Sequence, residues 1–269
     1  MNTHQHDRIT RQATWAGRYI VPIPCEHAKD SPDTFHQSRR TMVEPTSSTP
    51  PAETRTAVKI LITAGPTREP IDAVRVLSNR SSGLMGVAVA AEAVRRGHET
   101  TLLLGRGATH RPDASIHCRP FDTTAELAEL LCDCFPQADM LIMAAAVADF
   151  IPEPTAGGTK MSRHDGPRTL TLHPAPDLVA DVAAGKRSDQ TIIGFALEPA
   201  AELLERAAAK LARKGLDAIV ANPLEAMEST QVSGMFISAD GQIVDAPTDL
   251  PKDKFAEWLL DRAEQFSSH

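Results

Sequence analysis

The first stretch of this chain that can do chemistry is a polar loop containing Asn79, Ser81, Ser82 and Gly83. Two serines and a glycine directly before a helix leave backbone N–H groups free at the positive end of the helix dipole, and this arrangement binds anions. The side-chain amide of Asn79 can donate a hydrogen bond to a carboxylate or acyl oxygen. We therefore expect an anion-binding turn, with the simpler alternative that a serine only caps the helix.

A second polar loop follows an apolar run and reads Ala144-Ala-Ala-Val-Ala-Asp149. Small side chains such as Ala145 at the end of a strand let a flat ligand or another backbone approach closely. The carboxylate of Asp149 can accept from a ribose hydroxyl or a base, or bind Mg²⁺ through water. Close helix packing beside a solvated aspartate is the alternative.

A third loop, Gly157-Gly-Thr-Lys160-Met-Ser-Arg163, is basic and glycine-hinged in a chain whose net charge is −7. A mobile lysine above a triphosphate would neutralise the charge that develops on a leaving pyrophosphate. The loop does not match the phosphate-binding pattern GxxxxGK[ST], so a solvated surface loop is the alternative.

Three further charged residues are candidates for the same chemistry. Lys210 and Lys214 lie four residues apart in an alanine-rich helix, so they share one face and can clamp a phosphate. Arg75 lies just before the first loop and can contact an anionic substrate. The alternatives are a solvated helix face for the lysines and a local ion pair between Arg75 and Asp72.

The elements that must position these residues alternate between strands and helices. Such alternation predicts an α/β fold, Rossmann-like, with a mainly parallel sheet and helices on both faces, in which ligands bind beyond the carboxyl ends of the strands. A hairpin around Ala239-Asp240-Gly241 predicts a C-terminal antiparallel extension. The expected strands are 58–63, 100–104, 140–146, 191–195, 218–221, 232–238 and 242–245, and the expected helices are 83–96, 123–134, 200–214 and 252–266.

In the helix expected at 83–96, the apolar period places Ala90 and Ala91 on the core face and Glu92 on the polar face. Residues 1–57 differ from the rest, because they are rich in Pro, Ser and Thr and sustain no amphipathic period. Such a segment buries too little apolar surface to offset its ordering entropy. We therefore expect a disordered tail over 1–57 and one domain over 58–269.

Composition excludes several classes of function. The acidic net charge and the 4% of aromatic residues argue against a nucleic-acid partner. No run of 18 apolar residues exists, so no membrane-spanning helix is expected. The four cysteines form no CxxC pair and no secretory signal is visible, which favours a cytoplasmic location.

Taken together, these loops resemble phosphopantothenoylcysteine synthetase, the phosphopantothenate–cysteine ligase of coenzyme A biosynthesis. The similarity runs from about Val58 to Phe266. Its most specific parts are the stretches Ile62-Thr-Ala-Gly-Pro-Thr-Arg-Glu-Pro-Ile-Asp72, Ser78-Asn-Arg-Ser-Ser-Gly83, Ala145-Ala-Val-Ala-Asp149, Gly194-Phe-Ala196 and Asp217-Ala-Ile-Val-Ala-Asn222.

The resemblance implies a Rossmann-like homodimer that joins 4′-phosphopantothenate to cysteine. In bacterial-type members CTP activates the carboxylate as an acyl-cytidylate with release of pyrophosphate, and the amine of cysteine then displaces CMP. Mg²⁺ shields the triphosphate. The implied substrates are therefore 4′-phosphopantothenate, cysteine and CTP.

Carried over by position, the resemblance implies that Asn79 holds the acyl intermediate and that Lys160 acts in the activation step. Arg75, Asn79, Ser81, Ser82 and Gly83 match the substrate-side loop. The nucleotide-contacting positions are matched by Ala145, Asp149, Lys160, Pro176, Asp177, Leu178, Val179, Phe195, Lys210 and Lys214.

Two departures from the family pattern are visible. The loop reads Lys160-Met-Ser-Arg163 where bacterial members usually have Lys-x-Lys-Lys, and Ala175 stands where asparagine usually precedes the Pro-Asp pair. The residues before Val58 are too few for the flavin-dependent decarboxylase that many members carry. We therefore expect a stand-alone synthetase that needs no FMN, with the phosphopantothenoylcysteine decarboxylase on a separate chain.

Two other functions are compatible with a sheet of this kind. A nicotinamide-dependent short-chain reductase would need a GxGxxG motif and usually a Tyr-x-x-x-Lys pair, but the only tyrosine is Tyr19, in the expected tail. A non-catalytic nucleotide-binding protein would not need the catalytic set. The presence of Asn79, Asp149, Lys160, Lys210 and Lys214 favours the enzyme. The sequence does not decide between CTP and ATP.

Overall fold

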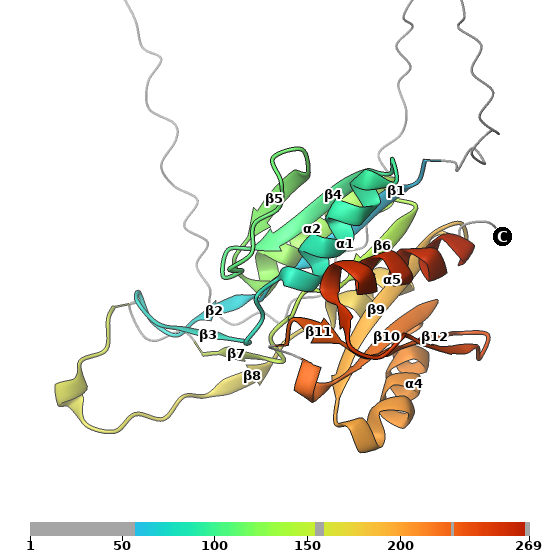
Figure 1. The fold of residues 1–269 in the computed structure, drawn as a ribbon. Helices are drawn as coiled ribbons and strands as arrows, with labels where there is room; N and C mark the ends of the chain where they lie inside the picture. The colour runs from blue at the N-terminus through green and yellow to red at the C-terminus, as the bar shows by residue number, and fades with distance from the viewer. Residues whose placement is uncertain (1–56, 154–158, 227–228, 267–269) are drawn as a thin grey trace, which may run out of the picture. The chain divides into compact units, whose positions relative to one another are not determined.

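The computed structural model describes residues 57–153, 159–226 and 229–266. Its centre is an eight-stranded sheet in the order β13-β12-β10-β9-β6-β1-β4-β5 (Figure 1). The strands are β1 (Lys59–Ala64), β4 (Glu99–Gly105), β5 (His117–Phe121), β6 (Met140–Met143), β9 (Thr191–Glu198), β10 (Ala218–Pro223), β12 (Met235–Ser238) and β13 (Ile243–Asp245).

The six strands from β10 to β5 are parallel, and β12 and β13 add to β10 as an antiparallel hairpin. This confirms the predicted α/β class and the C-terminal hairpin. Chain order reverses between β1 and β6, which are hydrogen-bonded neighbours. In sheets of this kind ligands bind beside this point, beyond the carboxyl ends of the strands.

In the described residues five α-helices pack on the two faces of the sheet: α1 (Leu84–Arg95), α2 (Thr124–Cys134), α3 (Leu178–Ala184), α4 (Leu203–Lys214) and α5 (Lys252–Phe266). Helices α1 and α5 share one apolar core with the sheet, and α2, α3 and α4 share another on the opposite face. Alternate residues of β1 separate the cores, because Ile60 and Ile62 face the first and Leu61 faces the second.

Short two-stranded ladders lie outside the main sheet. β2 (Arg68–Pro70) pairs with β3 (Val76–Ser78), β7 (Phe150–Pro152) pairs with β8 (Leu172–Pro174), and β11 (Gln231–Val232) pairs with β14 (Leu250–Pro251). The strand predicted at 232–238 is therefore divided, because Val232 pairs with β14 while β12 begins at Met235. Sequence patterns also missed β5 and α3, which are short.

Helix α1 buries most of the predicted face, because Ala90 is buried and Val87 and Val94 pack against the same core, but two residues differ from the prediction. Ala91 is exposed, whereas Glu92, assigned to the polar face, is only 7% exposed. The carboxylate of Glu92 accepts hydrogen bonds from Arg95 at 2.5 Å and from Arg96 at 2.6 Å. A buried carboxylate that is paired in this way is compatible with a core position, and periodicity alone does not show the pairing.

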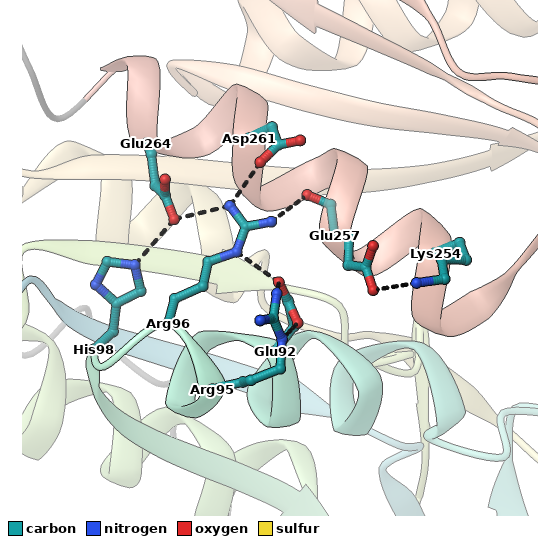
Figure 2. Close-up of polar contacts among 8 residues, drawn as sticks. All are labelled: Glu92, Arg95, Arg96, His98, Lys254, Glu257, Asp261 and Glu264. Atoms are coloured by element: carbon teal, nitrogen blue, oxygen red, sulfur yellow. Dashed lines mark hydrogen bonds and ion pairs between the residues drawn. The ribbon is translucent and has the colours of Figure 1, made fainter. Parts of the chain in front are cut away.

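Arg96, which directly follows α1, connects this helix to α5 (Figure 2). Arg96, with its side chain 6% exposed, donates to Asp261 at 2.8 Å, to Glu264 at 3.0 Å and to the carbonyl of Glu257 at 2.8 Å. His98 Nε2 lies 3.1 Å from the Glu264 carboxylate. This network fixes how α5 lies along α1.

Candidate functional site

A cleft of about 1100 Å³ opens at the carboxyl ends of the central strands. All the predicted site residues line it except Arg75 and Lys160. They come from the loops after β1 and β6, the segment 175–179, strand β9 and helix α4. Segments more than a hundred residues apart in sequence therefore meet at one place, as the strand order requires.

The two loops at the switch point are hydrogen-bonded to each other. Ala146 donates to the carbonyl of Gly65 at 2.9 Å, and Thr67 donates to the carbonyl of Ala146 at 3.2 Å. The Nδ2 of Asn79 donates to the carbonyls of Val147 at 3.0 Å and of Ala146 at 3.3 Å. The amide of Asn79 is thus held in a defined orientation at the mouth of the cleft, although the residue itself is exposed.

The start of α1 forms one wall of the cleft. Gly83 has a left-handed φ of 78°, and a Cβ there would lie 2.9 Å from the Cβ of Ala108. Helix α1 begins without a side-chain cap from Gly83 and without an acidic residue in its first turn. Ser82 Oγ accepts only weakly from Leu84 N, at 3.4 Å. The positive end of the helix is therefore open to an anion.

The opposite wall is basic. Lys214 forms an ion pair of 2.8 Å with Asp177, whose carboxylate also caps α3 through Ala180 N at 3.4 Å. Leu178 and Val179 are buried in the core below this turn. Lys210 is half-buried, and among the described residues it has neither a hydrogen bond nor an ion pair. Burial, and then the charge of Lys214, lower the pKa of Lys210.

The loop that carries Lys160 is attached to the substrate-side loop from outside the cleft. The carboxylate of Asp72 accepts from Met161 N at 3.1 Å, and the guanidinium of Arg75 donates to the carbonyl of Met161 at 3.3 Å. Arg75 also pairs with Asp72 at 2.5 Å, which is the local ion pair that the sequence left open. Lys160 is exposed. The two glycines before it lie outside the described residues.

Hydrogen bonds give the Asp72 carboxylate an unusual acidity. Its pKa is lowered to about 2, chiefly by the bond from Met161 N and also by those from Val74 N, Arg75 N and the Arg75 charge. The carboxylate is thus ionised at every physiological pH. The charged carboxylate can therefore hold the segment that begins at Lys160 at all of these pH values.

The structure adds cleft residues that sequence reasoning did not single out. Glu198 and Arg206 form an ion pair of 3.6 Å at its edge. The Oδ1 of Asn222, at the end of β10, is buried and has no hydrogen-bond partner among the described residues. Asn222 lay in a stretch that the resemblance had marked, whereas Lys252, which also lines the cleft, gave no sequence signal.

Within the described residues no group of three or more His, Cys, Asp or Glu side chains could hold a metal ion. Three carboxylates line the cleft: Asp149, Asp177 and Glu198. Asp177 pairs with Lys214 and Glu198 with Arg206, whereas the exposed Asp149 forms no ion pair among the described residues and is the one suited to a hydrated cation. No helix among the described ranges is long and apolar enough to cross a membrane.

Comparison with known proteins places this cleft in a family. The family described as the DNA/pantothenate metabolism flavoprotein C-terminal domain matches residues 56–266. The chain belongs to this family. The match covers nearly all the residues that build the sheet and the cleft, and it confirms at the level of the domain the resemblance read from the motifs.

Individual members of this family and related proteins are similar over most of the domain. The chain is 41% identical over 167 residues to a cysteine/cysteine sulfinic acid decarboxylase from an unknown prokaryotic organism, covering 62% of this chain and 46% of that protein. It is 39% identical over 194 residues to the coenzyme A biosynthesis bifunctional protein CoaBC of Mycobacterium tuberculosis, covering 68% and 46%. The chain thus spans about half the length of the curated relatives it matches.

The fold of the family is also shared. The crystal structure of the C-terminal domain of a CoaBC protein matches with a TM-score of 0.66 at 30% identity, covering 78% of this chain and 95% of that one. The Rossmann-like architecture of this flavoprotein C-terminal domain is therefore the architecture of the present chain.

Proposed function

We propose that this chain is a phosphopantothenate–cysteine ligase that uses CTP and Mg²⁺. The single observation that carries the proposal is the cleft, which brings Asn79, Asp149, the α1 N-terminus and the pair Lys210 and Lys214 together at the switch point. The family and the bifunctional coenzyme A biosynthesis relatives support the pathway.

In the first step a carboxylate oxygen of 4′-phosphopantothenate attacks the α-phosphorus of CTP, and the bond to the β,γ-pyrophosphate breaks. The lysines on α4 offset negative charge on the polyphosphate. We assign Lys160, which lies outside the cleft in this structure, to the same step from the family resemblance. Magnesium, when bound, shields the triphosphate oxygens, and Asp149 is the cleft carboxylate suited to hold its water or a ribose hydroxyl. Phe195, Ala145 and the turn Pro176, Asp177, Leu178 and Val179 contact the nucleoside.

In the second step the amine of cysteine attacks the acyl carbon, an amide forms and CMP leaves. The products are 4′-phosphopantothenoylcysteine, CMP and pyrophosphate. We assign Asn79 to the acyl intermediate, because its amide is already oriented by two carbonyls and stands beside the α1 turn of Ser81, Ser82 and Gly83. Arg75 acts from the substrate-side loop by holding the segment that carries Lys160.

We also propose a homodimer, whose product is consumed by a phosphopantothenoylcysteine decarboxylase activity. The ladders β2–β3 and β7–β8 support an interface between copies, because they expose apolar side chains that a monomer would leave in water. These are Val74, Val76, Phe150, Leu170 and Leu172, each at least 40% exposed.

Pyrophosphate release tests the proposal directly. The purified chain receives 4′-phosphopantothenate and Mg²⁺ with CTP or ATP in parallel, with and without cysteine. CTP-dependent release, followed by cysteine-dependent CMP and amide, is the expected result. Folded protein that releases no pyrophosphate with either nucleotide would contradict it and favour a non-catalytic nucleotide-binding function.

A further inference from the structure

Lys252 is a cleft residue whose charge has no counterpart among the described residues. It is half-buried and lines the cleft. Within the described part of the chain it makes no hydrogen bond or ion pair, and burial alone lowers its pKa. A desolvated ammonium is costly unless an anion reaches it.

The neighbouring lysine on the same helix shows the contrast. Lys254 is exposed and pairs with Glu257 at 2.7 Å, as a surface lysine commonly does (Figure 2). Lys252, the first residue of α5, also stands at the positive end of that helix, where a cation is disfavoured. Asp253 is acidic and in the same turn, but it is exposed and forms no ion pair with Lys252.

The position of Lys252 is set by two rigid attachments. Directly before it, Leu250 of β14 pairs with Val232 of β11, and Val232 also lines the cleft. Directly after it, α5 packs on α1 through Phe255 and is tied to it by the Arg96 network (Figure 2).

Helices α1 and α5 lie on one face of the sheet, whereas α4, with Lys210 and Lys214, lies on the other. Lys252 therefore reaches the cleft from the side of the open α1 N-terminus. Lys252 and the lysines of α4 therefore approach the cleft from opposite faces of the sheet.

We propose that Lys252 binds a phosphoryl group of a substrate together with the N-terminus of α1. Its ammonium supplies the charge, and the N–H groups at the start of α1 supply directed hydrogen bonds. Resting on the proposed function, this phosphoryl group belongs either to the triphosphate of the nucleotide or to the 4′-phosphate of the acid substrate.

Binding measurements on the full chain separate the two sources. Dissociation constants are measured for inorganic pyrophosphate, CTP, CMP, 4′-phosphopantothenate and pantothenate, with Lys252→Gln, Lys252→Arg and the control Lys254→Gln. Loss of one charged hydrogen bond predicts about tenfold or more weaker binding by Lys252→Gln. We expect Lys252→Arg to recover most of the lost affinity and Lys254→Gln to bind each ligand as tightly as the wild type.

The pattern of losses identifies the group. Weaker binding of pyrophosphate and CTP but not of CMP would assign Lys252 to the polyphosphate. Weaker binding of 4′-phosphopantothenate but not of pantothenate would assign it to the acid substrate. Affinities of Lys252→Gln within about twofold of those of Lys254→Gln for every ligand would overturn the proposal.

A second measurement needs no variant and covers the case in which Lys252→Gln does not fold. Wild-type protein is treated with an amine-reactive ester, and acylation of Lys252 and Lys254 is followed by mass spectrometry. Pyrophosphate or 4′-phosphopantothenate should protect Lys252 and leave Lys254 unchanged. Equal labelling of Lys252 with and without both ligands contradicts the proposal, whereas failure of wild-type amide formation would contradict only the proposed reaction.

Discussion

The carboxylate of Asp72 accepts a hydrogen bond of 3.1 Å from the backbone N–H of Met161, a residue 89 positions later in the chain. The contact joins the loop after β1 to the segment that follows β7. Lys160 is the residue directly before this anchor. We therefore expect a substitution at Asp72 to affect the position of Lys160 without altering the residues that line the cleft.

We expect Asp72→Asn to loosen this anchor and to slow the activation step. Because the native pKa of about 2 lies below the ordinary 3.8, the carboxylate stabilises the fold above about pH 4. This contribution is lost as the pH falls through 2. Carboxyl NMR titration of Asp72 measures the pKa, and a value near 3.8 would contradict the anchor.

Lys160→Gln should slow pyrophosphate release and leave the melting temperature unchanged, because Lys160 is exposed. Removing one transition-state charge contact predicts a loss of about tenfold or more in kcat. Lys254→Gln, which removes a lysine far from this loop, is the matched control. An unchanged rate of pyrophosphate release would indicate that this loop is only a solvated surface segment.

Asn79→Ala should still release pyrophosphate but stall before amide formation. Its side chain is exposed and donates to two carbonyls at the switch point, so the fold should persist. Quenched reactions that separate pyrophosphate from amide product make the measurement. A normal yield of the amide would contradict the role assigned to Asn79.

Lys210→Met should weaken nucleotide binding by about tenfold or more while raising or preserving the melting temperature of the free protein. The native pKa of Lys210 is lowered by burial and by Lys214, so the unfolded chain binds this proton more tightly. Stability of the free wild type should therefore rise with pH between the lowered pKa and 10.5.

This pH-dependent gain should be smaller in Lys210→Met, and thermal unfolding at several pH values measures it. Lys254→Met, at an exposed ion pair, is the control for loss of a lysine. A variant that binds CTP as tightly as the wild type would exclude Lys210 from the nucleotide site.

Gly86→Ala should destabilise the domain and disturb the start of α1. A Cβ at Gly86 would lie 2.5 Å from the Cβ of Ala64, at the end of β1. Overpacking of this kind costs about 1–3 kcal/mol. The control is Gly185→Ala, where the nearest atom lies at 3.9 Å, and equal melting temperatures of the two variants would contradict the close packing.

Much of the fold was predictable because its signals are local. The apolar run at 58–63 became β1, and the helix expected at 252–266 has the same bounds in the structure. Short elements such as α3 and β5 were missed because few residues carry their pattern. Glu92 was assigned to the wrong face because its burial depends on Arg96 and on α5, which lies 160 residues away in sequence.

The residues of the candidate site were also predictable only in part. Asn79, Asp149, Lys210 and Lys214 were singled out from residue type, spacing and motif, and all line one cleft. The sequence left the role of Arg75 open, and the structure shows the local pair with Asp72 as well as the contact to Met161. Lys252 gave no signal, because a lysine at the start of an amphipathic helix is ordinary until its surroundings are known.

By itself, then, the sequence determined most of the longer strands and helices, which family the motifs resemble, and which polar residues have suitable chemistry. These follow from periodicity and residue type, which are properties of neighbours along the chain. Only the tertiary structure decided the strand order, and with it the convergence of Asn79 and Lys210 on one cleft. It also decided which charges are paired, because desolvation and ion pairing depend on atoms brought together by packing.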